Sequence, residues 1–245
     1  MRAVTFDAYG TLYDTHSVAA ATEAAFPGYG GYITQVWRQK QLEYSWLRTA
    51  MGRWADFHTV TLDSLRYTLA TLGVDADDAV CNHLAEAYDH LAPYPEAREA
   101  LEALSGFRRA ILSNGSQKML DALVRNSGFG GLLEAVISVE AKNVFKPHRH
   151  AYELIGERLG VASPEVLFVS SNGFDVAGAA SFGLKVARIE RVGRGALATE
   201  LKSGSIGPET MFKALRTQEE ALGYPPAAVV RSLLELPAVL KDLAG

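Results

Sequence analysis

Hydrophobic residues follow different spacings in three successive parts of the chain. Near the start, the apolar run "RAVTF" leads into Asp7 and predicts a strand. From Thr15 to about Ala92, apolar positions recur at helical spacing, as in "VWRQKQLEYSWLRTAM". After Pro93 and Pro95, short apolar runs alternate with helical segments. The pattern therefore predicts one strand, a helical insert and then an alternating region.

The alternating region predicts a parallel sheet. Strands are expected at "RRAILSN", "AVISV", "EVLFVSSN" and "KVARIE", with helices at "KMLDALVRN", "HAYELIGERLG" and "DVAGAASFG" between them. This alternation is typical of an α/β fold with a doubly wound, parallel, Rossmann-like sheet. The first strand is expected to join the sheet. The chain then divides into a core domain of residues 1–14 and 93–245 and a helical cap domain of residues 15–92, inserted after the first strand.

Composition narrows the class of protein. The chain has 245 residues, of which 48% are hydrophobic and 21% charged, as in globular proteins with a sizeable core. The net charge of −4 gives no basic face for nucleic acid, and no apolar run approaches the roughly 20 residues that span a bilayer. Cys81 is the only cysteine, which excludes an intrachain disulfide and a cysteine-based zinc site. We expect a cytoplasmic protein without nucleic-acid or membrane partners.

Polar residues stand at the ends of the predicted strands. Asp7, the pair Ser113-Asn114 and the run 170–172 each close a strand, Asp175 follows, and Lys146 lies in the loop "VFKPH". In an open parallel sheet, ligands bind beyond the carboxyl ends of the strands. Each residue alone is more often a turn, cap or solvated side chain. Their order on successive strands is what favours a site.

These segments resemble the motifs of the haloacid dehalogenase superfamily. "DAYGT" resembles its first motif, "LSN" its second, Lys146 in "VFKP" its third and "SSNGFD" its fourth. Together with "WRQKQLEYSWLR", they resemble the L-2-haloacid dehalogenases over nearly the whole chain. The resemblance implies hydrolysis of short (S)-2-haloalkanoic acids to (R)-2-hydroxy acids and halide.

Two positions distinguish this chemistry from that of the superfamily phosphatases. Such phosphatases carry a second Asp two residues after the nucleophile and bind Mg²⁺, whereas this chain has Tyr9 there and Asn172 in place of a metal-binding acid. Halide leaves without a proton, but it needs hydrogen-bond donors or a cation where negative charge develops. We therefore expect a site without metal or cofactor.

The resemblance also implies roles for particular residues. Asp7 attacks C2 of the substrate to form an ester, which water hydrolyses with the help of Asp175 and Asn172. Lys146 stabilises the carboxylates, and Thr11 and Ser170 orient them. The remaining implied residues bind substrate or halide or line the pocket: Ala8, Tyr9, Arg38, Gln39, Leu42, Phe57, Ser113, Asn114, Tyr152 and Phe174. On spacing alone, Arg38 could equally be a solvated helix residue and Tyr152 a core aromatic.

The sequence leaves other functions open. The enzyme alternative is a magnesium-dependent phosphatase, and the non-enzyme alternative is a small-acid binding protein that kept the fold without turnover. "GRGALA" fits a loose dinucleotide fingerprint, but no acid stands at a following strand end. The aromatic residues Trp37, Tyr44, Trp46 and Trp54 exceed what a small insert is expected to bury. We therefore expect a homodimer formed through the cap.

Overall fold

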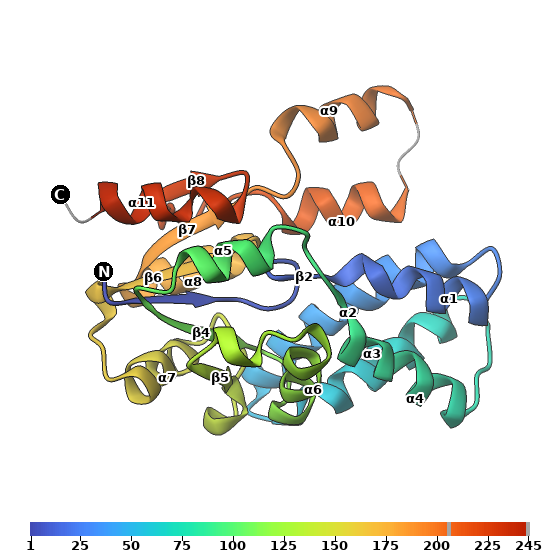
Figure 1. Cartoon of the computed structure of the whole chain (residues 1–245). Helices are drawn as coiled ribbons and strands as arrows, with labels where there is room; N and C mark the ends of the chain where they lie inside the picture. The colour runs from blue at the N-terminus through green and yellow to red at the C-terminus, as the bar shows by residue number, and fades with distance from the viewer. Residues whose placement is uncertain (205–206, 244–245) are drawn as a thin grey trace.

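A six-stranded parallel sheet forms the centre of the computed structural model, which describes residues 1–204 and 207–243 (Figure 1). The strand order is β5-β4-β1-β6-β7-β8. Its strands are β1 (Ala3–Phe6), β4 (Arg108–Ser113), β5 (Ala135–Ser138), β6 (Val166–Ser170), β7 (Lys185–Ile189) and β8 (Ala228–Val230). Every neighbouring pair is parallel. The predicted α/β Rossmann-like fold is confirmed, because parallel neighbours require crossover connections.

Helices cover both sides of this sheet (Figure 1). They are α5 (Ala97–Ala103), α6 (Gln117–Ser127), α7 (Arg149–Leu159), α8 (Gly173–Phe182) and α11 (Leu236–Asp242). Helix α7 packs against α8, and α5 packs against the 3₁₀ turn η6 (Leu233–Glu235). The predicted strands and helices from 108 to 189 all lie where the sequence pattern placed them.

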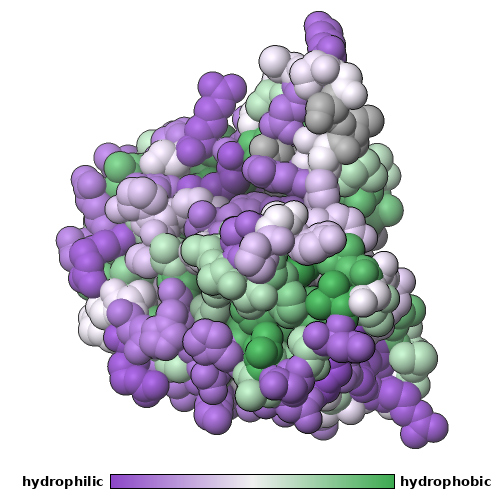
Figure 2. Space-filling view, turned by 90° about the vertical axis from the view of Figure 1, so that its right-hand side faces the viewer, coloured by the Kyte–Doolittle hydropathy of each residue, from purple (hydrophilic) through white to green (hydrophobic). Residues whose placement is uncertain are grey.

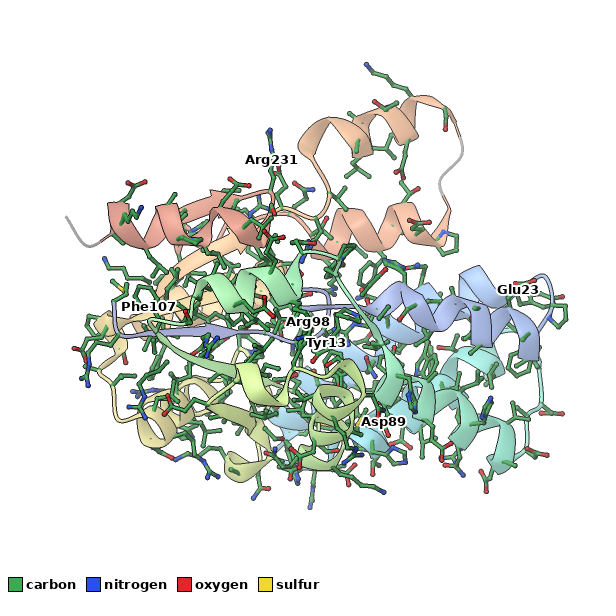
Figure 3. All side chains as sticks on the ribbon, in the orientation of Figure 1. Tyr13, Glu23, Asp89, Arg98, Phe107 and Arg231 are labelled. Atoms are coloured by element: carbon green, nitrogen blue, oxygen red, sulfur yellow. The ribbon has the colours of Figure 1, made fainter. Side chains whose placement is uncertain are left out.

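The insert after β1 is helical and lies beyond the carboxyl ends of the strands. It contains η1 (Thr15–Val18), α1 (Ala19–Ala25), α2 (Gly30–Met51), α3 (Phe57–Thr71), α4 (Asp78–Glu86) and η2 (Ala87–His90). Side chains fix where these helices begin, since Asp56 and Asp77 accept hydrogen bonds from the third backbone N–H after each of them. At the far end, Glu23 (labelled in Figure 3) accepts from the N–H groups of Gly28 and Gly30 and orders the loop before α2.

A short ribbon that the sequence pattern did not predict joins the insert to the core. Strand β2 (Tyr13–Asp14) pairs antiparallel with β3 (Ala92–Pro93). The two ends of the insert therefore meet, although they are far apart in the sequence. Tyr13, labelled in Figure 3, lies inside the molecule, and its hydroxyl is 2.9 Å from Oγ of Ser127 in α6.

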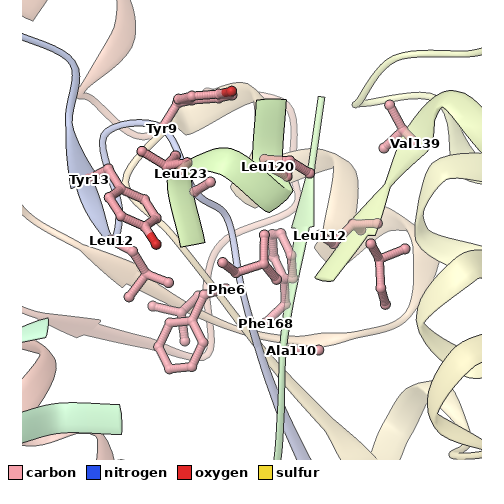
Figure 4. Close-up of a cluster of buried hydrophobic side chains, with 14 of the residues drawn as sticks. Phe6, Tyr9, Leu12, Tyr13, Ala110, Leu112, Leu120, Leu123, Val139 and Phe168 are labelled. Carbon is pink, nitrogen blue, oxygen red and sulfur yellow. The ribbon is translucent and has the colours of Figure 1, made fainter. Parts of the chain in front are cut away.

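The core of the sheet is apolar and ends at the site. Phe6 and Phe168 lie on neighbouring strands within one cluster of buried side chains, and Tyr9 lies at its edge (Figure 4). Because these strands are buried on both faces, they are continuous apolar runs. Polar residues follow at the carboxyl ends of β1, β4 and β6, which sets the position of the site.

One helical hairpin lies outside the sequence prediction. Helices α9 (Arg194–Lys202) and α10 (Pro208–Arg216) follow β7 and project from the core (Figure 1), and α10 packs against α2. The dinucleotide-like "GRGALA" supplies the N-cap and the first residues of α9. None of the described helices has the length and apolarity needed to cross a bilayer.

Candidate active site

Asp7 directly follows β1 and opens a tight turn. The carbonyl oxygen of Ala8 accepts backbone hydrogen bonds from Thr11, Leu12 and Tyr13 at 3.0 to 3.3 Å. Gly10 has φ +86°, a conformation in which a side chain is strained. A Cβ there would also lie 3.2 Å from Oγ of Ser171. The turn therefore explains why "DAYGT" carries its glycine, and it points the Asp7 carboxylate out of the strand.

Three donors hold the Asp7 carboxylate, which is only 4% exposed. Nζ of Lys146 is 2.9 Å from Oδ1, and Nδ2 of Asn172 donates to Oδ2 at 2.9 Å. Oγ1 of Thr11 donates to Oδ2 at 3.2 Å. A buried carboxylate that accepts hydrogen bonds from a cation and two further donors is held in one orientation.

Lys146 connects two carboxylates. Its Nζ also donates to Oδ2 of Asp175 at 2.8 Å and to the carbonyl oxygen of Leu112 at 3.0 Å, so all three of its N–H bonds have acceptors. Burial alone would lower the pKa of Lys146, but the charges of Asp175 and Asp7 outweigh burial and raise it. Lys146 is therefore a fixed positive charge between the two acids.

Asp175 is fully buried at the start of α8. The Tyr152 hydroxyl donates to its Oδ1 at 2.8 Å. Burial raises the pKa of Asp175, while Lys146 and the Tyr152 hydrogen bond oppose that rise. Asp175 is thus better placed to accept a proton than an exposed aspartate is. Tyr152 is a buried core aromatic, and its hydroxyl orients Asp175. The spacing of Tyr152 had left open whether it was a core aromatic or a residue of the site.

The outer contacts keep these groups in place. Thr11 Oγ1 accepts from the backbone N–H of Ser171 at 3.0 Å, and Ser170 Oγ accepts from the N–H of Asn172 at 3.2 Å. Asn114 Oδ1 accepts from the N–H of Lys146 at 2.8 Å. We call Asp7, Lys146, Asp175, Asn172 and Thr11 the polar floor. Ser171 was noted only as part of the polar run 170–172 and was given no role, and the Leu112 carbonyl was not predicted, since a backbone group leaves no mark in the sequence.

An aromatic wall, formed by Tyr9, Phe57 and Tyr88, stands beside the polar floor. The rings of Tyr9 and Phe57 stack with centroids 5.7 Å apart, and Tyr88 meets Tyr9 edge-on at 6.1 Å. The hydroxyls of Tyr9 and Tyr88 are buried without a hydrogen-bond partner. Burial raises the pKa of Tyr88 to about 12, so its hydroxyl stays neutral.

Arg38 brings a positive charge to this wall from α2. Its guanidinium carbon lies 5.6 Å from the Tyr9 ring centroid, and Nη1 donates to Oε1 of Gln41. Gln41 in turn donates to Oγ1 of Thr61 at 2.7 Å. Arg38 is 5% exposed, so it is not the solvated residue that its spacing allowed. Gln41 was missed, although it lies three residues after Arg38 on the same helix face.

Donors for an anion remain free at the turn. Among the described residues, neither the N–H of Ala8 nor that of Tyr9 has an acceptor. Ser113, which ends β4, is buried and accepts from the N–H of Gly115 at 3.3 Å. Tyr9, Arg38 and Asn172 line a cavity of about 350 Å³. The site can therefore admit a small anion next to Asp7.

The remaining predicted pocket residues lie further out. Leu42 is buried in α2, as expected. Phe174 packs on Trp46 with centroids 5.1 Å apart, at the start of α8. Gln39, predicted to line the pocket, instead accepts a hydrogen bond from Nε of Arg216 at 2.8 Å and lines a separate groove beside Phe212. Gln39 lies one residue after Arg38, so the helix turns it to a different side.

Within the described residues, no group of three His, Cys, Asp or Glu side chains could hold a metal ion. The cation between the two acids of the polar floor is the Lys146 ammonium.

Comparison with known proteins gives the family. A model of haloacid dehalogenase-like hydrolases matches residues 1–183. The (S)-2-haloacid dehalogenase of Xanthobacter autotrophicus is 58% identical over 245 residues, which cover 100% of this chain and 97% of that protein. The haloacetate dehalogenase H-2 of Moraxella sp. (strain B) is 48% identical over 195 residues, covering 79% of this chain and 87% of that protein. The chain belongs to the haloacid dehalogenase-like hydrolases.

Solved structures agree with this result. The L-2-haloacid dehalogenase of Xanthobacter autotrophicus has a TM-score of 0.96 and 58% identity, with 98% of each chain covered. The same enzyme with covalently bound chloropropionic acid also has a TM-score of 0.96, at 57% identity and with 98% of each chain covered. The recognised family and the fold expected from the sequence are confirmed.

Proposed function

We propose that the protein is an (S)-2-haloacid dehalogenase, a hydrolase that converts short-chain (S)-2-haloalkanoic acids to (R)-2-hydroxy acids and halide. The observation that carries this function is the buried Asp7 carboxylate, held by Lys146 and Asn172, with Asn172 also lining the cavity. The 58% identity to a dehalogenase over the whole chain supports it, as does the covalent chloropropionic acid complex of that relative.

In the first step, a carboxylate oxygen of Asp7 attacks C2 of the substrate from the side opposite the halide. The new C–O bond forms as the carbon–halogen bond breaks, the halide leaves with the bonding electrons, and C2 inverts. Asp7 becomes an ester. The free N–H groups of Ala8 and Tyr9, with Ser113, bind the substrate carboxylate. Arg38, Asn114 and Phe174 surround the departing halide, and Arg38 stabilises the charge that develops there.

In the second step, water attacks the side-chain carbonyl carbon of the Asp7 ester. Asp175 accepts a proton from this water, and Asn172 helps to place it. The ester C–O bond on the aspartyl side breaks, and the departing oxygen takes the second proton of the water, so that the 2-hydroxy acid leaves and Asp7 returns to its carboxylate. Asp175 then releases its proton to solvent. Lys146 holds both acids throughout, and Ser170, Thr11 and Tyr152 keep Asn172, Asp7 and Asp175 in position. Leu42, Phe57 and Gln39 complete the surroundings, Gln39 through its contact with Arg216.

Trapping the ester tests this mechanism. During turnover of (S)-2-chloropropionate, rapid-quench mass spectrometry should show an adduct on the peptide that contains Asp7. The Asp7→Asn variant should lose at least about 10⁴-fold in kcat. An active wild-type enzyme without such an adduct would rule out covalent catalysis by Asp7. The (R) enantiomer should release no halide at a comparable rate.

The reaction needs no metal or other cofactor under this proposal. Asn172 and Tyr9 replace two carboxylates that a magnesium site would use, and Lys146 supplies the positive charge between the acids. Halide release should therefore be the same with EDTA as with added Mg²⁺. Complete inhibition by EDTA, or magnesium-dependent release of phosphate from an aryl phosphate, would favour the phosphatase alternative. Binding of the haloacid without any halide release would favour the silent binding protein.

The domain division also stays a proposal, with residues 1–14 and 93–245 as core and 15–92 as cap. The pairing of β2 with β3 at the two junctions supports these boundaries. We further propose a cytoplasmic location, from the single cysteine, and no nucleic-acid or membrane partner, from the net charge of −4.

We also propose a homodimer formed through the cap. The residues that support it differ from the aromatic residues that suggested it in the sequence. Trp37 is fully buried, and Tyr44, Trp46 and Trp54 are partly buried within the chain. Exposed apolar side chains nevertheless include Leu47 and Met51 of α2 and Met211 and Leu215 of α10. Figure 2, which views the molecule from the side of the cap, shows apolar residues gathered on that face. A monomer in sedimentation at micromolar concentration would contradict the dimer.

A further inference from the structure

The chain crosses the active site again after α10. Arg216 ends α10, and we call residues 216–220 the strap. Thr217 lines the same cavity as Tyr9, Arg38 and Asn172. The strap lies beyond residue 183, where the match to the family model ends. Membership of the family therefore assigns it no role.

Two contacts hold the strap against the site. A Cβ built on Gly173 would lie 2.1 Å from the carbonyl oxygen of Gln218, so the strap backbone rests directly on the first residue of α8. That residue stands between Asn172 and Phe174. Nη1 of the buried Arg188 donates to the carbonyl oxygen of Thr217 at 3.0 Å. The strap is thus fixed from the sheet and from α8.

Arg216 connects the strap to the cap. Its Nε donates to Gln39 at 2.8 Å, and its guanidinium carbon lies 4.5 Å from the Trp46 ring centroid. Trp46 packs edge-on against Phe174, with centroids 5.1 Å apart. Gln39 is the neighbour of Arg38 in α2. Arg216 therefore contacts Gln39 and Trp46 of α2, and through Trp46 it supports Phe174.

Arg216 also keeps a positive charge near Arg38. Burial lowers the pKa of Arg216, Glu220 opposes this, and the charge of Arg38 lowers it further. In the part of the chain that the structure describes, Arg216 forms no ion pair within 4 Å. Two partly buried cations near each other repel, and an anion that arrives close to them relieves the repulsion.

We propose that Arg216 is a positioning residue for halide departure, which holds Trp46 and Phe174 against the site and adds its positive charge to that of Arg38. This inference rests on the proposed dehalogenase function and deepens it. The residue comes from the C-terminal hairpin, so the hairpin takes part in the choice of leaving group.

Chloride and bromide distinguish this role from general support of the fold. Chloride holds its charge more densely and is the poorer leaving group, so its departure depends more on nearby positive charge. Loss of Arg216 should therefore slow the chloride substrate more than the bromide substrate. A strap that only stabilised the fold would affect both substrates equally.

The experiment compares kcat and KM for (S)-2-chloropropionate and (S)-2-bromopropionate. For Arg216→Met, the ratio of kcat for chloride to kcat for bromide should fall about fivefold. Arg216→Lys, which keeps the charge, should recover part of that ratio. Inhibition by free bromide ion should weaken in Arg216→Met by a similar factor. Gly173→Ala, which pushes the strap backbone away from α8, should lower the same ratio.

Two matched variants serve as controls. Glu219→Gln removes a charge from an exposed residue of the strap, and Gly195→Ala adds a Cβ in the same hairpin where nothing lies within 4 Å. Both should keep the wild-type ratio. If Arg216→Met slows both substrates equally, leaves both unchanged, or behaves as Arg216→Lys does, the inference is wrong. A wild-type protein that releases no halide would instead refute the dehalogenase function itself.

Discussion

Asn172 of the polar floor and Tyr9 of the aromatic wall line the same cavity, but floor and wall are built differently. In the floor, both oxygens of Asp7 and of Asp175 and all three N–H bonds of Lys146 have partners. In the wall, the hydroxyls of Tyr9 and Tyr88 are buried without a partner. The floor is therefore ordered before any substrate arrives, whereas the wall has polar groups that only a ligand could satisfy. We infer that the floor carries the chemistry and the wall receives the substrate.

We expect the largest effect from a substitution that removes the cation of the floor. Lys146→Met should lower kcat by about 10³-fold or more and destabilise the fold by about 3–5 kcal/mol near neutral pH, because two buried carboxylates lose their counter-charge. Lys146 opposes the rise in the pKa of Asp175, so its loss raises that pKa further. A higher pKa means that Asp175 gains its proton at higher pH. The acid limb of the kcat profile, which includes the hydrolysis step, should therefore move to higher pH.

Lys146→Arg is the matched control for that change, because it keeps the charge in an altered geometry. It should keep more stability than Lys146→Met. An acid limb that stays in place in Lys146→Met would show that the floor does not depend on this cation.

We expect the next largest effect from a substitution that removes the positive charge beside the wall. Arg38→Met should lower kcat by about 10²- to 10³-fold, since halide would leave without the nearest cation on that side. Stability should change less than in Lys146→Met, because Arg38 is held by the neutral Gln41 and not by a carboxylate. Steady-state halide release and urea unfolding measure the two quantities. A large loss of stability with little loss of kcat would reverse the roles given to floor and wall.

We expect a smaller effect from a substitution in contact with the floor that slows only the second step of the reaction. Tyr152→Phe removes the hydrogen bond to Oδ1 of Asp175 and should slow ester hydrolysis by about 10- to 50-fold. The Asp7 ester should then accumulate in quenched samples. Because that hydrogen bond lowers the pKa of Asp175, the acid limb should rise here too, by less than in Lys146→Met. Tyr13→Phe, which loses a hydrogen bond to Ser127 away from the site, should show neither change.

The smallest effect tests the unpartnered hydroxyls of the wall. Tyr9→Phe and Tyr88→Phe should leave the free energy of unfolding unchanged or raise it by about 1 kcal/mol, since a buried hydroxyl without a partner is unfavourable. KM should change severalfold only in the variant that loses a hydroxyl in contact with the substrate. Thermal or urea unfolding with and without substrate separates these contributions. A clear loss of stability in either variant would mean that its hydroxyl has a partner after all.

Much of the fold could be predicted from the sequence because its signals are local. The apolar runs that end in Asp7, Ser113 and Ser170 marked strands and their ends together, and a parallel sheet brings such ends to one edge. The α9–α10 hairpin was missed because both helices are short, with 9 residues each, and α9 carries only a weak apolar period. The β2–β3 ribbon was missed because two-residue strands have no pattern of their own.

The sequence alone determined which chemical groups the site could contain: a carboxylate after β1, a lysine before α7, and Tyr9 and Asn172 where a metal site needs acids. Motifs determine this because each is a short run whose spacing fixes its place on a strand end.

Only the tertiary structure decided which of these groups touch. It placed Lys146 between Asp7 and Asp175, turned Gln39 toward Arg216, and laid the Gln218 carbonyl on Gly173. These contacts join residues far apart in the chain, and they depend on the side to which each helix turns and on how the hairpin packs. No local pattern encodes that, because a distance across the fold is set by the packing of the whole core.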